Sequence, residues 1–307
     1  MFVVCGEALM DVFAAGDTPS GMALDARVGG SPFNVAVGLA RLGQNVSLLA
    51  SISRDFLGQR LVQALDQEGV QTSTVERTDS ATTLSLVGLD AHHMPSYAFY
   101  GEGGADRQLS RHALQHLPAN TRVIHVASYA TVVEPIASTL RALVEHEQTR
   151  RLVSFDPNVR LNVEPDVCLW VSQLEWMLPR THVLKISDED LGLLLPKIGV
   201  EDFAAQALAK GVQLVVITRG AKGAMAWTAH HHACTGSIPV PVIDTVGAGD
   251  TFQAALLTWM AENAVVSAQA VPNMSQAALL NALSFASRAA AITCSRRGAD
   301  LPRRHEV

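Results

Sequence analysis

The amino-acid sequence predicts an α/β protein with a doubly wound, mostly parallel sheet that carries helices on both faces. Short apolar runs rich in Val, Ile and Leu alternate with longer amphipathic stretches over roughly 200 residues, a pattern typical of buried parallel strands joined by helices. Hydrophobic residues make up 48% and charged residues 17% of the 307 residues. This composition supplies a buried core and excludes a disordered chain.

The apolar runs predict six strands, at residues 3–5, 46–51, 123–127, 152–155, 183–186 and 214–218. The stretches between them predict helices at 32–42, 56–68, 132–146, 188–195 and 202–210, and two Ala-rich helices follow at 248–263 and 276–293.

Segments 12–28 and 84–100 break this alternation, because they combine β-type residues with Gly and Pro turns and have no helix between their strands. We expect them to form a small β-sheet lid. No linker, repeat or low-complexity tract divides the chain, so we expect one domain over residues 1–307.

Charge and composition exclude several classes of partner. With 23 basic and 29 acidic residues the formal net charge is −6, so we expect no nucleic-acid partner. No uninterrupted apolar run approaches the ~18 residues of a membrane span, and Glu7 and Asp11 stand too early for a signal peptide. The four cysteines form no Cys-x-x-Cys pair, which favours reduced thiols in a cytoplasmic protein.

Residues 243–252 are the sharpest motif, and an Ala-rich helix follows them. Gly247 and Gly249 allow tight turns and close approach of a ligand, and unpaired amides at a helix start suit a phosphate. Asp250, in the first helical turn, could cap the helix or act as a base for a hydroxyl nucleophile. The motif is neither a dinucleotide fingerprint nor a P-loop.

Polar clusters at 6–11, 29–34, 156–160 and 218–223 stand where loops should leave strand ends. Each alone is typical of a turn or a helix cap. Because loops at the carboxyl ends of parallel strands share one crevice, the four together predict a binding site there. Glu7 and Asp11 also suggest the paired carboxylates of a hydrolase, but no second carboxylate motif supports that reading.

These motifs together resemble the ribokinase-like (pfkB-type) carbohydrate kinases over almost the whole chain, and bacterial fructokinases most of all. The resemblance rests on residues 29–36 and 244–250, supported by 6–11, 99–100, 105–106, 156–160 and 185–189. It implies the doubly wound fold with a β lid, and ATP-dependent phosphorylation of a primary sugar hydroxyl with Mg²⁺. D-fructose, giving fructose 6-phosphate, is the expected acceptor.

The resemblance also implies a role for each matching residue. Asp250 is the expected general base, and the amides of Gly247, Ala248 and Gly249 form the expected anion hole. The other implied contacts are Asp11, Gly30, Asn34, Phe99, Asn158 and Arg160 for the sugar; Lys185, Thr218, Gly220, Gly223, Gly247, Gly249 and Ser287 for ATP; Glu189 and Asp190 for Mg²⁺ through water; and Asp244 with the carbonyl of Val246 for a monovalent cation such as K⁺.

The sequence departs from the family pattern in two places. Residues 187–190 read Ser-Asp-Glu-Asp where the family often has Asn-x-x-Glu, which leaves open whether Glu189 or Asp190 serves the Mg²⁺ shell. Ser287 replaces an Asn that often stands near the adenine pocket.

Three alternatives to a fructose kinase stay open. The first two are kinases for 2-keto-3-deoxygluconate or for a ribonucleoside such as aminoimidazole riboside. The third is a sugar sensor that keeps the fold without catalysis, although the retained Asp250 and Gly-x-Gly favour an active kinase.

The lid segment 96–102 is acidic and aromatic, which suits a neutral sugar, and the lid could also serve as a homodimer interface. His92-His93 and His230–His232 are predicted to lie in solvated turns rather than to bind metal.

Overall fold

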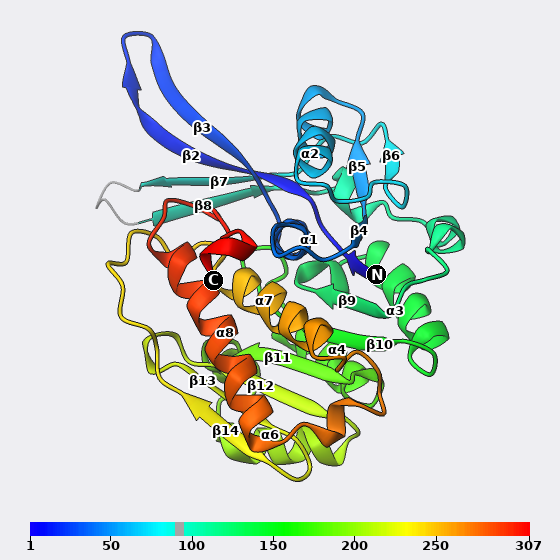
Figure 1. Ribbon diagram of the computed structural model, residues 1–307. Helices are drawn as coiled ribbons and strands as arrows, with labels where there is room; N and C mark the ends of the chain where they lie inside the picture. Colours follow the sequence, from blue (N-terminus) through cyan, green and yellow to red (C-terminus); the bar gives the residue numbers. More distant parts are fainter. Residues whose placement is uncertain (90–94) are drawn as a thin grey trace.

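A central sheet of eight strands organises the molecule (Figure 1). The structure, a computed structural model, describes residues 1–89 and 95–307. The strand order is β14-β13-β12-β11-β10-β9-β1-β4, parallel from β12 to β4, with β13 and β14 added antiparallel at one edge. The strands are β1 (Phe2–Cys5), β4 (Val46–Leu49), β9 (Val123–Ala127), β10 (Leu152–Asp156), β11 (Val183–Ser187), β12 (Leu214–Thr218), β13 (Ala224–Trp227) and β14 (His232–Thr235).

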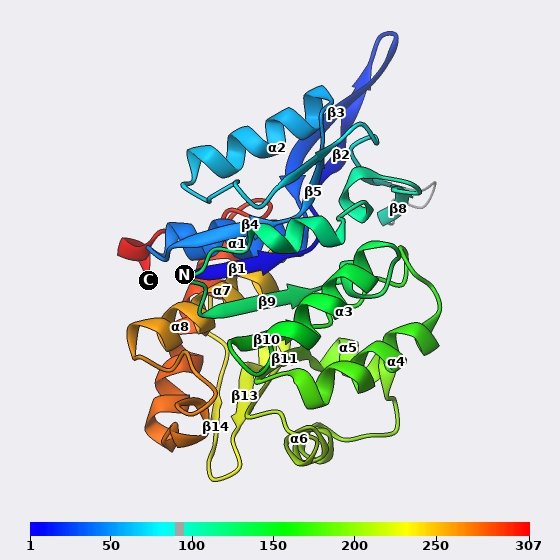
Figure 2. The ribbon, with the colours of Figure 1, turned by 90° about the vertical axis from the view of Figure 1, so that its right-hand side faces the viewer.

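Helices cover both faces of this sheet, so the predicted doubly wound class is confirmed (Figure 2). One face carries α1 (Ser31–Arg41), α7 (Ala248–Glu262) and α8 (Gln276–Cys294). The other carries α3 (Ile136–Glu147), α4 (Val167–Met177), α5 (Asp188–Leu194) and α6 (Val200–Ala209).

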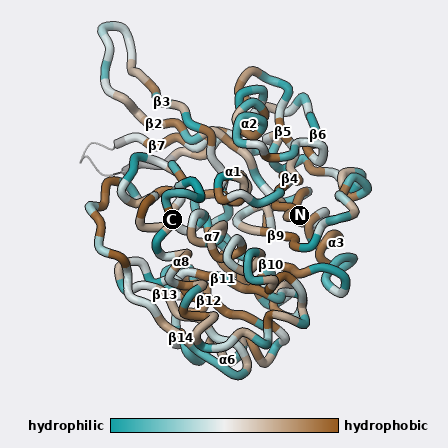
Figure 3. The backbone as a smooth tube through the Cα atoms, in the orientation of Figure 1, coloured by the Kyte–Doolittle hydropathy of each residue, from teal (hydrophilic) through white to brown (hydrophobic). Residues whose placement is uncertain are grey.

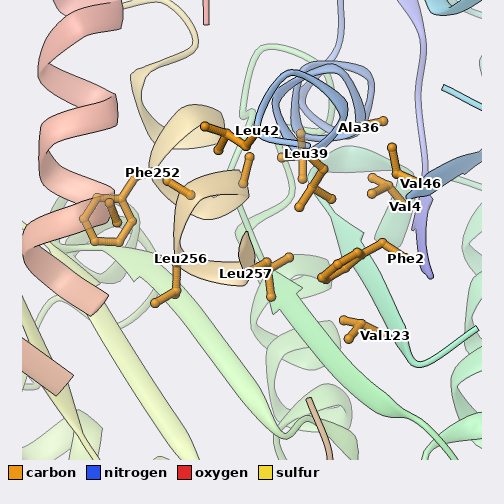
Figure 4. Close-up of a cluster of buried hydrophobic side chains, with 14 of the residues drawn as sticks. Phe2, Val4, Ala36, Leu39, Leu42, Val46, Val123, Phe252, Leu256 and Leu257 are labelled. Atoms are coloured by element: carbon orange, nitrogen blue, oxygen red, sulfur yellow. The ribbon is translucent and has the colours of Figure 1, made fainter. Parts of the chain in front are cut away.

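The core lies between the sheet and these two helical layers, and the central strands are accordingly among the most hydrophobic parts of the chain (Figure 3). Side chains of α1 and α7 meet those of β1 and β4, with Phe2, Val4, Leu39 and Leu257 buried together (Figure 4). Burial of each such side chain contributes about 1.5–3 kcal/mol. This packing fixes the starts of α1 and α7 relative to each other.

The lid is a separate four-stranded sheet with the order β3-β2-β7-β8. It consists of β2 (Leu9–Thr18), β3 (Gly21–Gly29), β7 (Leu84–Leu89) and β8 (Pro95–Tyr100), close to the predicted segments. The β2–β3 hairpin extends away from the body of the molecule (Figure 1). The turn predicted at His92-His93 lies outside the described residues.

Several sequence predictions were wrong in detail. The predicted strand 46–51 is two strands, because β5 (Ser51–Ser53) leaves the main sheet and pairs with β6 (Glu76–Thr78) beside α2 (Phe56–Gln67). The predicted helix 132–146 begins only at Ile136, after Pro135 at the N-cap, which has no N–H to donate. Helix α4 was not predicted at all.

The two Ala-rich helices and the histidine turn are close to their predicted positions. His230 and His231 lie exposed in the turn between β13 and β14, and His232 begins β14. Among the described residues, only α8 is long and apolar enough by composition to cross a membrane. It packs against α7, β13 and β14 and contributes Leu279 and Leu283 to the core.

Candidate active site

A cavity of about 610 Å³ lies between the lid and the starts of α1 and α7, at the carboxyl edge of the parallel strands. Three of the four predicted loop clusters, 6–11, 29–34 and 156–160, meet here, whereas the fourth, 218–223, lines a neighbouring cavity. All six residues expected to contact the sugar line this cavity, namely Asp11, Gly30, Asn34, Phe99, Asn158 and Arg160, and Val246, Gly247, Gly249 and Asp250 join them.

A second cavity, of about 690 Å³, lies beside the first. Of the residues expected at ATP, it is lined by Lys185, Thr218, Gly220, Gly223, Gly249 and Ser287, and it also reaches Ala248, Glu189 and Asp190. Gly247, also expected at ATP, lines only the first cavity. The two cavities share four residues, Asn158, Arg160, Thr245 and Gly249. They therefore meet at the start of α7.

Asp250 sits at this junction, in the first turn of α7, and only 8% of its surface is exposed. Its carboxylate accepts a hydrogen bond from Ser31 Oγ at 2.7 Å and another from Asn34 Nδ2 at 2.8 Å. Burial raises the pKa of Asp250, while the bonds from Asn34 and Ser31 and the nearby Arg160 and Lys185 act in the opposite direction. The two hydrogen bonds thus orient the carboxylate, and the bonds together with Arg160 and Lys185 offset part of the cost of burying its charge.

The start of α7 is built to receive an anion. Gly247 is its N-cap with φ 76°, a left-handed conformation that favours glycine, and no side chain caps the helix. A Cβ on Gly247 would lie 2.6 Å from Cβ of Ala299, so a larger residue would displace the loop. The Ala248 amide donates to the Thr245 carbonyl at 3.2 Å, and the positive end of the helix dipole at this start suits a phosphate.

Lys185 supplies positive charge beneath this turn. Its Nζ donates to Asp156 Oδ2 at 2.7 Å, and both side chains are almost fully buried. Burial lowers the pKa of Lys185, but Asp156, Asp190 and Asp250 outweigh that effect and the pKa stands above its usual value. The same Nζ would lie 3.2 Å from a Cβ on Gly249, so the cation lies close to the expected phosphate loop.

Two predicted metal sites have oxygen donors in place. Glu189 is exposed and Asp190 is buried at the start of α5, and both line the second cavity. No group of three or more His, Cys, Asp or Glu side chains suited to a metal occurs among the described residues. Two carboxylates without a third ligand fit Mg²⁺, which usually keeps several waters. At the other site Asp244 accepts hydrogen bonds from the amides of Val246 and Gly298, at 3.0 and 2.8 Å.

Some residues of the site were not assigned a role from the sequence. Glu7 lines the sugar cavity and is 1% exposed, and its Oε1 accepts from the Ser31 amide at 3.3 Å. Tyr129 donates to Asp106 at 2.8 Å and packs edge-on against Phe99, with ring centroids 5.6 Å apart. Glu7, Ser31 and Asp106 stand inside the quoted motifs, but only the fold reveals their partners.

Comparisons with known proteins agree with this geometry. The chain matches the pfkB family carbohydrate kinases over residues 1–305. It is 32% identical to a fructokinase of Rhizobium leguminosarum bv. trifolii over 281 residues, which cover 92% of this chain and 86% of the relative.

Solved structures show the same architecture. A fructokinase from Xylella fastidiosa with bound ATP superposes with a TM-score of 0.90 at 27% identity, covering 99% of this chain and 96% of that one. A fructokinase double mutant from Vibrio cholerae O395, with fructose, ADP and potassium ion bound, gives 0.81 at 28% identity, covering 97% and 93%. From its sequence and its fold, this chain belongs to the pfkB family of carbohydrate kinases.

Proposed function

We propose that this protein is an ATP-dependent kinase that phosphorylates the primary 6-hydroxyl of D-fructose. The observation that carries the proposal is the pair of cavities that meet at Asn158, Arg160, Thr245 and Gly249, with Asp250 on one side and Lys185 on the other. The relatives named fructokinase, and the neighbours with ATP or with fructose and ADP bound, support the assignment of the two cavities to sugar and nucleotide.

The transfer step follows from this arrangement. The oxygen of the sugar hydroxyl bonds to the γ-phosphorus while Asp250 accepts the proton of that hydroxyl. The bond from the γ-phosphorus to the β–γ bridging oxygen breaks and releases ADP. The amides of Gly247, Ala248 and Gly249 and the Lys185 ammonium compensate the charge of the transferring group. When bound, Mg²⁺ would be held near Glu189 and Asp190 and would neutralise phosphate charge.

The charges of the sugar cavity favour a neutral acceptor. Arg160 is the only basic side chain among the described residues that line it, whereas Asp11 and Asp250 are acidic. A sugar acid would need its carboxylate neutralised. Asp11 and Asn34 can instead bind hydroxyls, and Phe99 can cover an apolar C–H face.

A coupled ADP assay over three acceptors tests the proposal. We expect kcat/KM for fructose to exceed that for 2-keto-3-deoxygluconate and for aminoimidazole riboside. We also expect ³¹P NMR of the fructose product to show the phosphate at the 6-position. Equal or better turnover of either rival acceptor would overturn the fructose assignment. Stabilisation by fructose in a thermal-shift experiment, with no ADP formed, would indicate a sensor instead.

Two further features belong to the same proposal. Activity should depend on Mg²⁺ and increase with K⁺, which Asp244 and the Val246 carbonyl would bind.

The exposed apolar side chains of Met22 and Leu24 on β3 suit a homodimer formed through the lid, and light scattering would report its mass.

A further inference from the structure

Both carboxylate oxygens of Asp250 are held by the first turn of another helix. Ser31 Oγ donates to Oδ1 at 2.7 Å, and Asn34 Nδ2 donates to Oδ2 at 2.8 Å. Ser31 and Asp250 are 219 residues apart in the sequence, and both are buried, with 7% and 8% of their surfaces exposed. Because both groups are largely shielded from water, these bonds are electrostatically stronger than they would be in solution.

Ser31 is itself fixed from the opposite side. Helix α1 starts after Gly30, which has φ 104° and offers no side-chain cap. The carboxyl of Glu7 takes that place, because its Oε1 accepts from the Ser31 amide at 3.3 Å. A Cβ on Gly30 would lie 2.8 Å from the Glu7 carbonyl oxygen, so the turn is close-packed as well as hydrogen-bonded.

The charged groups that face Asp250 come from three other elements. Asp11 on β2 repels its charge, whereas Arg160 after β10 and Lys185 on β11 attract it. Burial raises the pKa of Asp250 above its usual value, and the donor bonds from Asn34 and Ser31 oppose that rise. A neutral donor bonded to a carboxylate favours the ionised form, which is the form that can accept a proton.

We propose that Ser31 is a positioning residue for Asp250: its hydroxyl keeps the carboxylate ionised and in one orientation at the junction of the two cavities. The proposal rests on the base role of Asp250 given above. Asn34 bonds the other oxygen, and both residues line the sugar cavity, but only Asn34 is expected to contact the sugar itself. Measuring KM for fructose beside kcat therefore separates an effect of Ser31 on the base from an effect on sugar binding.

The pH profile of kcat/KM for fructose in Ser31→Ala is the decisive measurement. We expect its acidic limb to move to higher pH by about one unit, because the carboxylate loses a donor. At neutral pH kcat should fall about tenfold while KM for fructose changes less than about twofold, since Ser31 acts through the base. Ser31→Thr keeps a hydroxyl and should restore most of both values. Ser31→Cys, with a weak thiol donor, should shift the limb in the same direction as Ser31→Ala.

The matched control is Ser275→Ala. Ser275 caps the distant helix α8 through a bond from the Ala278 amide at 3.2 Å, so its loss removes one serine hydrogen bond away from the site. It should lower the melting temperature without moving the pH profile. An unmoved acidic limb in folded Ser31→Ala or Ser31→Cys would overturn the positioning role, and so would an equal shift in Ser275→Ala. If instead Asp250→Asn turned over at the wild-type rate, the proposed base itself would be wrong.

Discussion

Burial gives the carboxyl groups around the sugar cavity unequal protonation. Burial is the main reason that the pKa of Glu7 is raised to about 8 and the pKa of Asp11 to about 6. The charge of Arg160 acts in the opposite direction on both pKa values. Near neutral pH Glu7 is therefore mostly protonated and Asp11 mostly ionised. The cavity can offer ionised acceptors to sugar hydroxyls without gathering three adjacent negative charges.

Glu7→Gln should change how stability depends on pH. The pKa of Glu7 rises from 4.5 to about 8 on folding. The contribution of this shift to the free energy of unfolding is therefore full below about pH 4.5 and is lost as pH rises through 8. Glutamine never ionises, so the variant should gain stability relative to the wild type between pH 5 and 8, with a slope of up to about 1.4 kcal/mol per pH unit. Urea unfolding at several pH values measures this. A difference that stays constant with pH would contradict it.

Asp250→Asn should lower kcat by about 10²–10⁴, the usual contribution of a positioned base. Asparagine keeps the size of the side chain and one acceptor oxygen, so ATP affinity and melting temperature should change little. Steady-state kinetics and nucleotide titration measure the two effects separately. Turnover close to that of the wild type would remove Asp250 from its proposed role.

The contacts of Asp250 also mark the limit of sequence reasoning at this scale. Asp250 and Asn34 could be named because both stand in recognisable motifs. The hydrogen bonds that join them, and the one from Ser31, depend on how α1 packs on α7, and no local pattern encodes that distance. Glu7 was likewise visible in the sequence, but its partner on α1 was not.

Among the elements, the buried parallel strands were the easiest to predict. β9 and β12 match their predicted bounds, because a strand covered on both faces is mostly apolar, although β9 also contains the buried His125. Helix α4 was missed because Val167, Leu169, Trp170 and Val171 place apolar side chains on several faces, so no single stripe with a 3.6-residue period stands out. The order of the strands in the sheet was not predicted, since it depends on crossovers.

Phosphoryl transfer depends most directly on the geometry at the start of α7. Gly249→Val should abolish most activity, because its Cβ would approach Lys185 Nζ at 3.2 Å and its methyl groups would occupy the loop that faces both cavities. Fructose binding, measured by calorimetry without ATP, should survive. Loss of fructose binding together with activity would indicate misfolding rather than a blocked anion hole.

At the scale of the molecule, one sheet supports two cores. Val3 and Val4 are neighbours on β1, yet Val4 packs in the cluster with α1 and α7, and Val3 in the cluster with α3 and α4. Neither core can lose its packing without exposing the same strands. The two cavities share residues at the carboxyl ends of the strands of this sheet. Sugar and nucleotide are therefore expected to bind to the same cooperatively unfolding unit.

We therefore expect one cooperative thermal transition that either ligand moves to higher temperature. At 100 times its Kd, a ligand that binds only the folded state adds about 2.7 kcal/mol of stability. Fructose and a non-hydrolysable ATP analogue, added separately and then together, should each raise the single calorimetric transition, and Asp250→Asn should respond similarly because both cavities remain. Two transitions, of which fructose moved one and the nucleotide the other, would show instead that the two halves of the site belong to units that unfold independently.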